Sequence, residues 1–387
     1  MNTALITSMT ALAEDMRRVR RDLHRHPELA YEERRTAGVV AERLRSWGIE
    51  VHERIGGTGL VGVITAGSAT RAIGLRADMD ALPIQEATGA SYSSVHPGVM
   101  HACGHDGHTA MLLGAARYLA DTRRFNGRVN LIFQPAEEGK AGAQAMIDDG
   151  LFERFPCAEV YALHNWPALP AGTVATRAGP IMAAADRFDI QITGTGGHAA
   201  LPHLATDTIL CAAQIVTGAH TLVARRIDPS APAVLSITRI QGGNSHNVLP
   251  SKVEITGTVR SFDPQVQDTL EAALRELVAA ATKASGCTAV VDYVRYYPPV
   301  INDPQCAEHV LEAGRALFGQ ALRADAPAAT SEDFAFMLRK VPGAYVWLGQ
   351  GSASHRASLH DPEFDFNDDV LVAGASLLAT LAERRLS

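Results

Sequence analysis

The chain has 387 residues, of which 47% are hydrophobic and 20% are charged, so it can bury a sizeable core and is long enough for two domains. Its formal net charge of −7, from 42 acidic and 35 basic residues, argues against a nucleic-acid-binding protein, which usually carries a concentrated basic surface. The sequence has no apolar run long enough to cross a membrane, no signal-peptide pattern and only five dispersed cysteines, so we expect a reduced, cytoplasmic protein.

The first part of the chain alternates helix and strand patterns. Hydrophobic periodicity predicts helices at residues 9–25 and 32–47, the second ended by Gly48. Apolar runs predict short strands with helices between them: strands at 61–65, 73–76, 129–133 and 160–163, and helices at 107–120 and 142–149. This alternation predicts an α/β domain with a mixed, mostly parallel sheet and helices on both faces.

The pattern changes after Ala178-Gly179-Pro180. The next segments predict two helices and four strands: strand 188–193, helix 207–224, strands 233–241 and 252–261, helix 265–285 and strand 288–295. The last part resumes the first pattern, with helix 303–318, strand 344–348 and helix 368–385. We therefore expect a discontinuous larger domain, residues 1–183 and 297–387, interrupted by a smaller α+β domain at residues 184–296.

The densest cluster of metal-binding residue types is His101-Ala-Cys103-Gly-His105-Asp-Gly-His108. A thiolate and an imidazole two residues apart, across a glycine, can turn toward one ion, and both suit zinc and its first-row neighbours. The cluster alone leaves two alternatives open. One is a cysteine nucleophile with a nearby histidine, and the other is a buried, inert thiol beside the start of a helix.

The adjacent carboxylates Glu137 and Glu138 follow the strand expected at 129–133. Pro135 stops that strand and Gly139 opens a turn, so the pair lies at the carboxyl end of a sheet strand, where open α/β sheets bind ligands. Neighbouring residues in extended chain point to opposite sides. We therefore expect one carboxylate to bind metal and the other to face the water that is activated.

Two histidines follow the ends of expected strands, His164 after 160–163 and His360 after 344–348. With the first cluster they offer five dispersed ligands and a spare carboxylate: Cys103, His105, one of the two glutamates, His164 and His360. A structural zinc site usually has four ligands in tight pairs, so this set fits a catalytic site better. It also suggests two ions that share Cys103 as a bridge.

Two other features carry no function in this interpretation. The segment Gly57-Thr-Gly59-Leu-Val-Gly62 matches a dinucleotide-binding pattern, but it leads into β-branched residues rather than a helix, so we reject it. Six histidines lie on polar segments and are expected to be exposed: His24, His26, His52, His96, His220 and His309.

The chain closely resembles the hippurate hydrolase, aminoacylase and auxin-conjugate hydrolase branch of the carboxypeptidase G-like metallopeptidases. The resemblance runs nearly end to end and is carried by these segments: Leu23-His-Arg-His-Pro-Glu-Leu, Leu75-Arg-Ala-Asp-Met-Asp-Ala-Leu-Pro, His101-Ala-Cys-Gly-His-Asp-Gly-His, Phe133-Gln-Pro-Ala-Glu-Glu-Gly, Gly197-His-Ala-Ala-Leu-Pro-His, Asn247-Val-Leu-Pro, Ser331-Glu-Asp-Phe and Leu359-His-Asp-Pro. Wider relatives carry His at the position of Asp78 and Asp as the metal bridge. This chain has Asp78 and Cys103, as its own branch does.

The resemblance implies an amidohydrolase that cleaves N-acyl amino acids, such as hippurate-like or N-acetyl compounds, with two divalent ions per chain. The ions would be zinc or manganese, with nickel or cobalt as alternatives, bound by five residues: Cys103, His105, Glu138, His164 and His360. Glu137 would be the general base. We place Asp80 behind the ligands, where it would orient one of them.

The resemblance also implies a homodimer in which the inserted domain is a lid and dimerisation domain. His198 would reach the partner's active site and stabilise the oxyanion, and Asn247 and Arg260 would contact substrate. The residues alone leave ordinary interpretations open, a turn residue for His198 and a surface residue for Arg260.

Two other functions stay open at this point. The first is a metallo-dipeptidase or carboxypeptidase with the same metals, which would favour a dedicated carboxylate for the free ammonium group of its substrate. The sequence identifies none. The second is a metal-binding scaffold without turnover, which would need no spare carboxylate beside the ligands.

Overall fold

The computed structural model describes residues 3–387, which fall into two compact units. The larger unit is made of three segments: the described residues up to Ile181, Ile301–Ala326 and Asp333–Ser387. The smaller unit is made of two: Met182–Val300 and Pro327–Glu332. The chain passes from the smaller to the larger unit for the last time at Glu332–Asp333.

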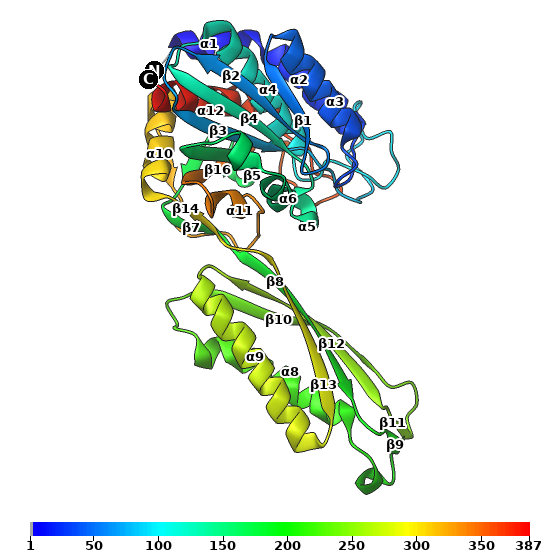
Figure 1. Ribbon diagram of the computed structural model, residues 1–387. Helices are drawn as coiled ribbons and strands as arrows, with labels where there is room; N and C mark the ends of the chain where they lie inside the picture. The colour runs from blue at the N-terminus through cyan, green and yellow to red at the C-terminus, as the bar shows by residue number, and fades with distance from the viewer. Residues whose placement is uncertain (1–2) are drawn as a thin grey trace. The chain divides into compact units, whose positions relative to one another are not determined.

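A mixed sheet of eight strands forms the centre of the larger unit (Figure 1). In spatial order the strands are β1 (Glu50–Ile55), β2 (Gly59–Ala66), β4 (Gly127–Gln134), β3 (Ala72–Asp78), β5 (Glu159–Pro170), β16 (Gly343–Gly351), β6 (Val174–Thr176) and β15 (Leu322–Arg323). The four central strands β4, β3, β5 and β16 run parallel, whereas β1, β2 and β6 join antiparallel. The predicted mixed, mostly parallel sheet is confirmed.

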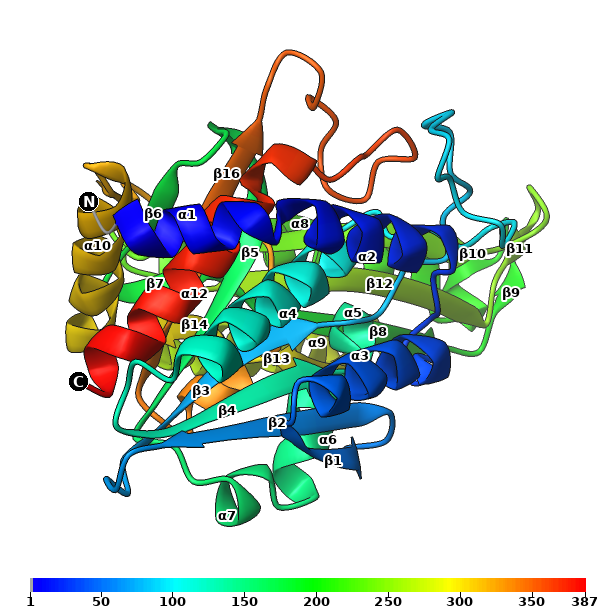
Figure 2. The ribbon, with the colours of Figure 1, turned by 90° about the horizontal axis from the view of Figure 1, so that it is seen from above.

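Helices cover both faces of this sheet, as predicted. Figure 2 shows α4 and α12 crossing over β3. The helices on this face are α1 (Thr3–Ala11), α2 (Ala13–Arg25), α3 (Arg34–Ser46), α4 (His105–Thr122) and α12 (Leu371–Arg385), the last preceded by the 3-10 turn η2 (Asp368–Val370). The other face carries α5 (Glu137–Lys140), α6 (Gly142–Asp148), α7 (Leu151–Arg154) and α11 (Ala335–Leu338). Helix α10 (Pro304–Phe318) packs on β16, β6 and α12.

Helix α4 is buried on all sides over its first three turns, because it lies between β3 and the helices α2 and α12. A helix enclosed in this way needs apolar residues around its whole circumference, and the run from Thr109 to Ala116 supplies them. Strand β3 is likewise buried at every position, as central parallel strands are. This packing fixes the start of α4 against the carboxyl end of β3.

The smaller unit is an antiparallel sheet of four strands with two helices on one face. Its strands, in spatial order, are β10 (Ala233–Gly242), β12 (Lys252–Ser261), β8 (Ala184–Thr193) and β13 (Thr288–Tyr297). Helices α8 (Thr208–Arg226) and α9 (Pro264–Ser285) pack side by side on this sheet around a separate apolar core (Figure 1). The predicted unit of two helices and four strands is confirmed.

Short elements complete the fold. They are the strand pair β9 (Gly197–His198) and β11 (Val248–Leu249), the pair β7 (Gly179–Met182) and β14 (Val300–Asn302), and the 3-10 turn η1 (Pro202–Leu204). No helix among residues 3–387 is long and apolar enough to span a membrane.

Some predicted element boundaries were wrong. The helix expected at 9–25 is two helices, which meet at Leu12. Strand β1 was not predicted, and β5 continues through His164 to Pro170 instead of ending before it. The rejected glycine pattern begins in the turn between the antiparallel strands β1 and β2 and continues into β2 rather than into a helix, so rejecting it as a dinucleotide site agrees with the fold.

Candidate metal centre and active site

The proposed ligands gather where the parallel strands of the larger unit approach the start of α4. Cys103 and His105 stand at that start, and Glu138 follows β4. His164 lies within β5, and His360 follows β16 in an irregular segment. Carboxyl ends of parallel strands share one edge of a sheet, which explains why residues far apart in sequence meet here.

Two groups of potential ligand atoms share one sulfur. The ligand atoms of Cys103, His105 and His164 lie within 4.8 Å of one another, and so do those of Cys103, Glu138 and His360. The Cys103 Sγ–His164 Nε2 distance is 3.4 Å, and the Glu138 Oε1–His360 Nε2 distance is 3.1 Å. The structure thus brings all five proposed ligands together, with Cys103 common to both groups.

In two of the proposed histidine ligands, Nδ1 is held by a neighbouring oxygen, which leaves Nε2 to face the centre. His164 Nδ1 lies 2.8 Å from the carbonyl oxygen of Asn165, and His105 Nδ1 lies 3.3 Å from Asp80 Oδ1. Metal-binding histidines are usually oriented in this way through their second nitrogen. Within residues 3–387, buried His105 Nε2 and Glu138 Oε1 have no well-aligned hydrogen-bond partner. A buried imidazole nitrogen and a carboxylate oxygen beside a thiol fit divalent transition metals.

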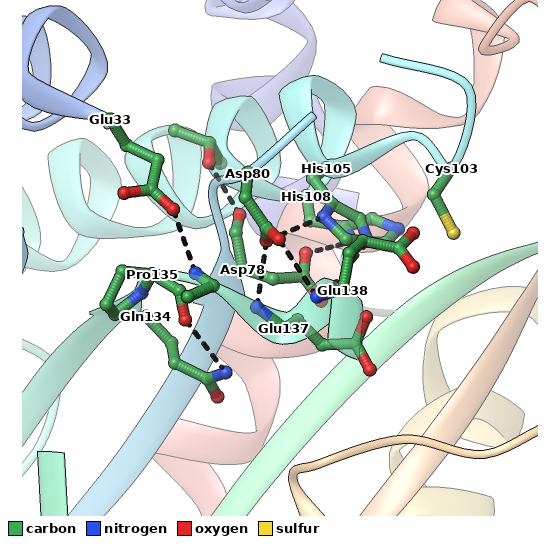
Figure 3. Close-up of polar contacts among 12 residues, drawn as sticks. Glu33, Asp78, Asp80, Cys103, His105, His108, Gln134, Pro135, Glu137 and Glu138 are labelled. Atoms are coloured by element: carbon green, nitrogen blue, oxygen red, sulfur yellow. Dashed lines mark hydrogen bonds and ion pairs between the residues drawn. The ribbon is translucent and has the colours of Figure 1, made fainter. Parts of the chain in front are cut away.

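Asp80 holds both glutamates by their backbone. Its Oδ1 accepts a hydrogen bond from the Glu137 N–H at 3.0 Å and its Oδ2 accepts one from the Glu138 N–H at 2.9 Å. Figure 3 shows Asp80 between these two nitrogens and the ring of His105. One side chain therefore sets the positions of a histidine and of the Glu137-Glu138 segment.

The premise that Glu137 and Glu138 lie in extended chain was wrong. Residues 136–139 form a turn, with positive φ angles at Ala136 (54°) and Gly139 (74°). The Ala136 N–H donates to Glu33 Oε1 at 2.9 Å, which holds the turn from the other side. The two carboxylates nevertheless have different surroundings, because Glu137 is buried and Glu138 is half-buried.

Glu137 lies beside the ligands but is held by a separate donor. One of its oxygens lies within 4.8 Å of the ligand atoms of His105 and Glu138. Its Oε1 accepts a hydrogen bond from the backbone N–H of Asp333 at 3.3 Å. A buried carboxylate next to metal ligands has the position that a general base requires.

A further layer of buried polar residues lies behind the ligands, and sequence reasoning did not assign it. His108 Nδ1 lies 2.5 Å from Asp78 Oδ1, and Arg76 Nη1 donates to Asp78 Oδ2 at 2.7 Å. The ligand atoms of Asp78, His105 and His108 also lie within 4.8 Å of one another, but Asp78 already pairs with Arg76 and His108 with Asn165. The signal that sequence offered was two charged residues, Arg76 and Asp78, in a strand that is otherwise apolar.

The electrostatics of the centre oppose a free thiolate. Burial, together with the carboxylates of Glu138 and Glu137, raises the pKa of the Cys103 thiol. Burial lowers the pKa of His105, but the carboxylates of Asp78 and Asp80 outweigh burial and raise this pKa to about 10. In contrast, burial and the nearby His108 lower the pKa of His164. A bound cation would stabilise the thiolate form of Cys103 and so lower this raised pKa. These surroundings argue against Cys103 as a free nucleophile.

One histidine that we expected to be exposed is fully buried. His24 Nδ1 lies 2.9 Å from Asp106 Oδ2 and its Nε2 lies 3.3 Å from Glu86 Oε1. Burial lowers its pKa, but these two carboxylates outweigh burial and raise the pKa to about 9. Because Asp106 follows His105, this buried pair supports the first turn of α4.

The three residues predicted in the inserted domain lie in the smaller unit. His198 is exposed on β9 and pairs with Val248 of β11, and the Ala199 N–H donates to the carbonyl oxygen of exposed Asn247 at 3.0 Å. Arg260 is half-buried on β12 and donates to the carbonyl oxygen of Val259 at 3.0 Å. His198 and Asn247 are thus neighbours in the fold.

The family model described as peptidase family M20/M25/M40 matches residues 74–384. The chain belongs to this peptidase family. It is 38% identical to the hippurate hydrolase of Campylobacter jejuni over 99% of both chains. It is also 38% identical to the N-acetyl-L-cysteine deacetylase of Bacillus subtilis, over 98% of this chain and 90% of that one.

A solved structure described as a dinuclear metal-binding peptidase of the M20 family, from Bacillus subtilis, is similar in fold. It has a TM-score of 0.85 and 34% identity, over 97% of this chain and 99% of that one. Membership of this family makes the chain a metal-dependent enzyme of the amidohydrolase and peptidase type. The resemblance stated from the sequence motifs is confirmed.

Proposed function

We propose that this enzyme hydrolyses the amide bond of N-acyl amino acids, releasing a carboxylic acid and a free amino acid. The observation that carries the proposal is the pair of ligand groups that share Cys103 beside the buried carboxylate of Glu137. The names of the two relatives, a hippurate hydrolase and an N-acetyl-L-cysteine deacetylase, support this substrate class.

Two divalent ions would be held by Cys103, His105 and His164 on one side and by Cys103, Glu138 and His360 on the other. The thiolate and imidazole ligands favour zinc or another late first-row ion, and manganese is an alternative. Such ions, when bound, polarise an amide carbonyl and lower the pKa of water.

Glu137 would supply the proton transfers. In this role it takes a proton from the attacking water as the carbon–oxygen bond forms, and then delivers that proton to the leaving amide nitrogen as the carbon–nitrogen bond breaks. The Asp80 and Asp333 hydrogen bonds support this role, because they fix the backbone and one oxygen of Glu137.

The proposal includes a homodimer that completes the site. The metal ligands all lie in the larger unit, whereas His198, Asn247 and Arg260 lie in the smaller one. We propose that His198 of a second copy donates a hydrogen bond to the developing oxyanion, and that Asn247 and Arg260 bind the substrate carboxylate.

The division of roles between the two glutamates is the first testable prediction. Glu137→Gln should keep both metal ions and lower kcat by about 10²–10⁴-fold, the usual contribution of a general base. Glu138→Gln should lower metal content instead. Elemental analysis and turnover of the same preparations measure both effects, with Glu312→Gln on the surface as the matched control. Equal metal loss in both variants would contradict this assignment.

The alternative is a peptidase that acts on substrates with a free amino group, as the name of the family suggests. Mass-spectrometric turnover of N-acyl amino acids and of dipeptides with the same C-terminal residues separates the two. Preferential cleavage of the dipeptides would overturn the proposed substrate class and leave the roles of the glutamates intact.

A further inference from the structure

Asp333 donates its backbone N–H to the carboxylate proposed as the general base. The distance from Asp333 N to Glu137 Oε1 is 3.3 Å, and both residues are buried. Hydrogen bonds from backbone N–H groups to a carboxylate are charge-assisted and directional. The position of this nitrogen therefore fixes the orientation of the Glu137 side chain.

The Asp333 side chain is anchored at both oxygens. Oδ1 accepts hydrogen bonds from Gln134 Nε2 at 2.8 Å and from Arg76 Nη2 at 3.2 Å, and Oδ2 accepts one from the Ala143 N–H at 2.9 Å. All three partners are buried. Arg76 and Gln134 come from the adjacent central strands β3 and β4, so the anchor is built on rigid elements of the larger unit.

The place of Asp333 in the chain explains why such an anchor is needed. The preceding segment Pro327–Glu332 belongs to the smaller unit, and Asp333 is the first residue after the chain passes back into the larger unit. The bonds from its side chain to β3, β4 and α6 hold the nitrogen in place independently of the segment before it.

We propose that Asp333 is a positioning residue for Glu137, and that its bonds with Arg76, Gln134 and Ala143 fix the N–H that orients this base. The proposal rests on the proposed role of Glu137. Without the anchor the Asp333 N–H shifts and the carboxylate that it orients shifts with it, and misplacing a catalytic group by about 1 Å can lower the rate by about 10²-fold.

Asp333→Asn tests this, because it keeps the size of the side chain and its backbone N–H but loses the charge that Arg76 binds. We expect kcat to fall by about 10–10²-fold, with KM changed by less than about 3-fold and metal content unchanged. Asp303→Asn is the matched control, because Asp303 caps α10 and lies outside the site. That control should keep the wild-type kcat and KM.

The deciding measurement combines Asp333→Asn with Glu137→Gln. If Asp333 acts through Glu137, adding Asp333→Asn to Glu137→Gln should leave the residual kcat within about 2-fold. A purely structural role would lower kcat by the same factor in both backgrounds, or would lower metal content, and either result overturns the proposal. Wild-type turnover by Glu137→Gln alone would instead show that the proposed function is wrong.

Gln134→Met keeps the test falsifiable if Asp333→Asn does not fold. It removes the neutral donor to Asp333 Oδ1 and also the Gln134 Oε1 that accepts from Arg76 Nε at 2.8 Å, while the charge of Arg76 is kept. We expect Gln134→Met to lower kcat less than Asp333→Asn does when Glu137 is intact. In a protein that already carries Glu137→Gln, it should cause no further loss of kcat. An equal loss in both backgrounds would again refute the proposal.

Discussion

At Gly104 both the backbone conformation and the packing exclude a side chain. Its φ of +92° lies in the region that glycine adopts without strain, and a Cβ built there would lie 2.2 Å from Asn165 Oδ1. Gly104 separates the proposed ligands Cys103 and His105, and Asn165 follows the proposed ligand His164. This one close approach therefore sets the distance between two parts of the metal centre.

The prediction for this residue is that Gly104→Ala separates the ligands and lowers metal content. The cost combines backbone strain of about 1–3 kcal/mol with the clash against Asn165. Gly89→Ala is the matched control, because Gly89 also has a positive φ (+67°) but a Cβ there meets nothing within 4 Å. Elemental analysis and thermal unfolding of both variants measure these effects. Equal loss of metal from Gly104→Ala and Gly89→Ala would contradict the prediction that the clash with Asn165 separates the ligands.

That the proposed ligand residues gather at one place could be predicted from sequence, because their types and their positions near strand ends limit what they can do. The residues that orient them could not. Asp333 lies about two hundred positions from Glu137, and only the assembled sheet shows that its N–H reaches that carboxylate. The burial of His24 was missed for the same reason, since its partners Asp106 and Glu86 are distant in sequence.

At the scale of elements, periodicity predicted the central strands and long helices but not the edges of the sheet. Strand β1 (Glu50–Ile55) has exposed or half-exposed residues at all positions except Ile55, so its sequence has no apolar run. It is held by pairing with β2, a contact that no local pattern shows. The turn at residues 136–139 was missed because it needs a positive φ at Ala136, a residue that rarely adopts one.

Glu159 connects β5 to the C-terminal helix, and its pKa gives a prediction at this scale. Burial raises the pKa, but hydrogen bonds from Arg385 and Tyr161 and the charges of Arg385 and Arg71 outweigh burial and lower it to about 2. A lowered carboxyl pKa stabilises the fold above the unfolded pKa of about 4.3, and this stabilisation is lost as pH falls toward 2. Because Arg71 is partly exposed, we discount the contribution for screening to about 1–2 kcal/mol at pH 7.

Glu159→Gln should therefore lower the free energy of unfolding of the metal-free protein by about 1–2 kcal/mol at pH 7, and the two proteins should converge between pH 4.3 and 2. Urea unfolding at a series of pH values measures this. Glu308→Gln is the control, because Glu308 also pairs with two arginines but its side chain is 36% exposed, against 8% for Glu159, and it should change stability little. A difference from wild type that is constant with pH would contradict the electrostatic explanation.

At the scale of the whole molecule, the proposed active-site residues are divided between two separately packed cores. The larger unit holds every proposed metal ligand and Glu137, and the smaller unit holds His198. An oxyanion donor must lie about 3 Å from the reacting oxygen, which demands a firmly held group. We propose that the two-fold interface of a homodimer provides this by presenting His198 to the site of the other copy.

Mixing two inactive proteins, Glu137→Gln and His198→Ala, tests this proposal. In a mixed dimer the subunit with intact Glu137 would receive intact His198 from its partner, and the other site would carry both defects. Random exchange makes about half of the dimers mixed, each with one intact site, so activity should return to about a quarter of the wild-type value. The control mixture of Glu137→Gln and Glu138→Gln should recover nothing, because each of its sites keeps a defect in its own chain. Subunit exchange verified by mass tagging, without recovery in the first mixture, would show that His198 does not act in the partner's site.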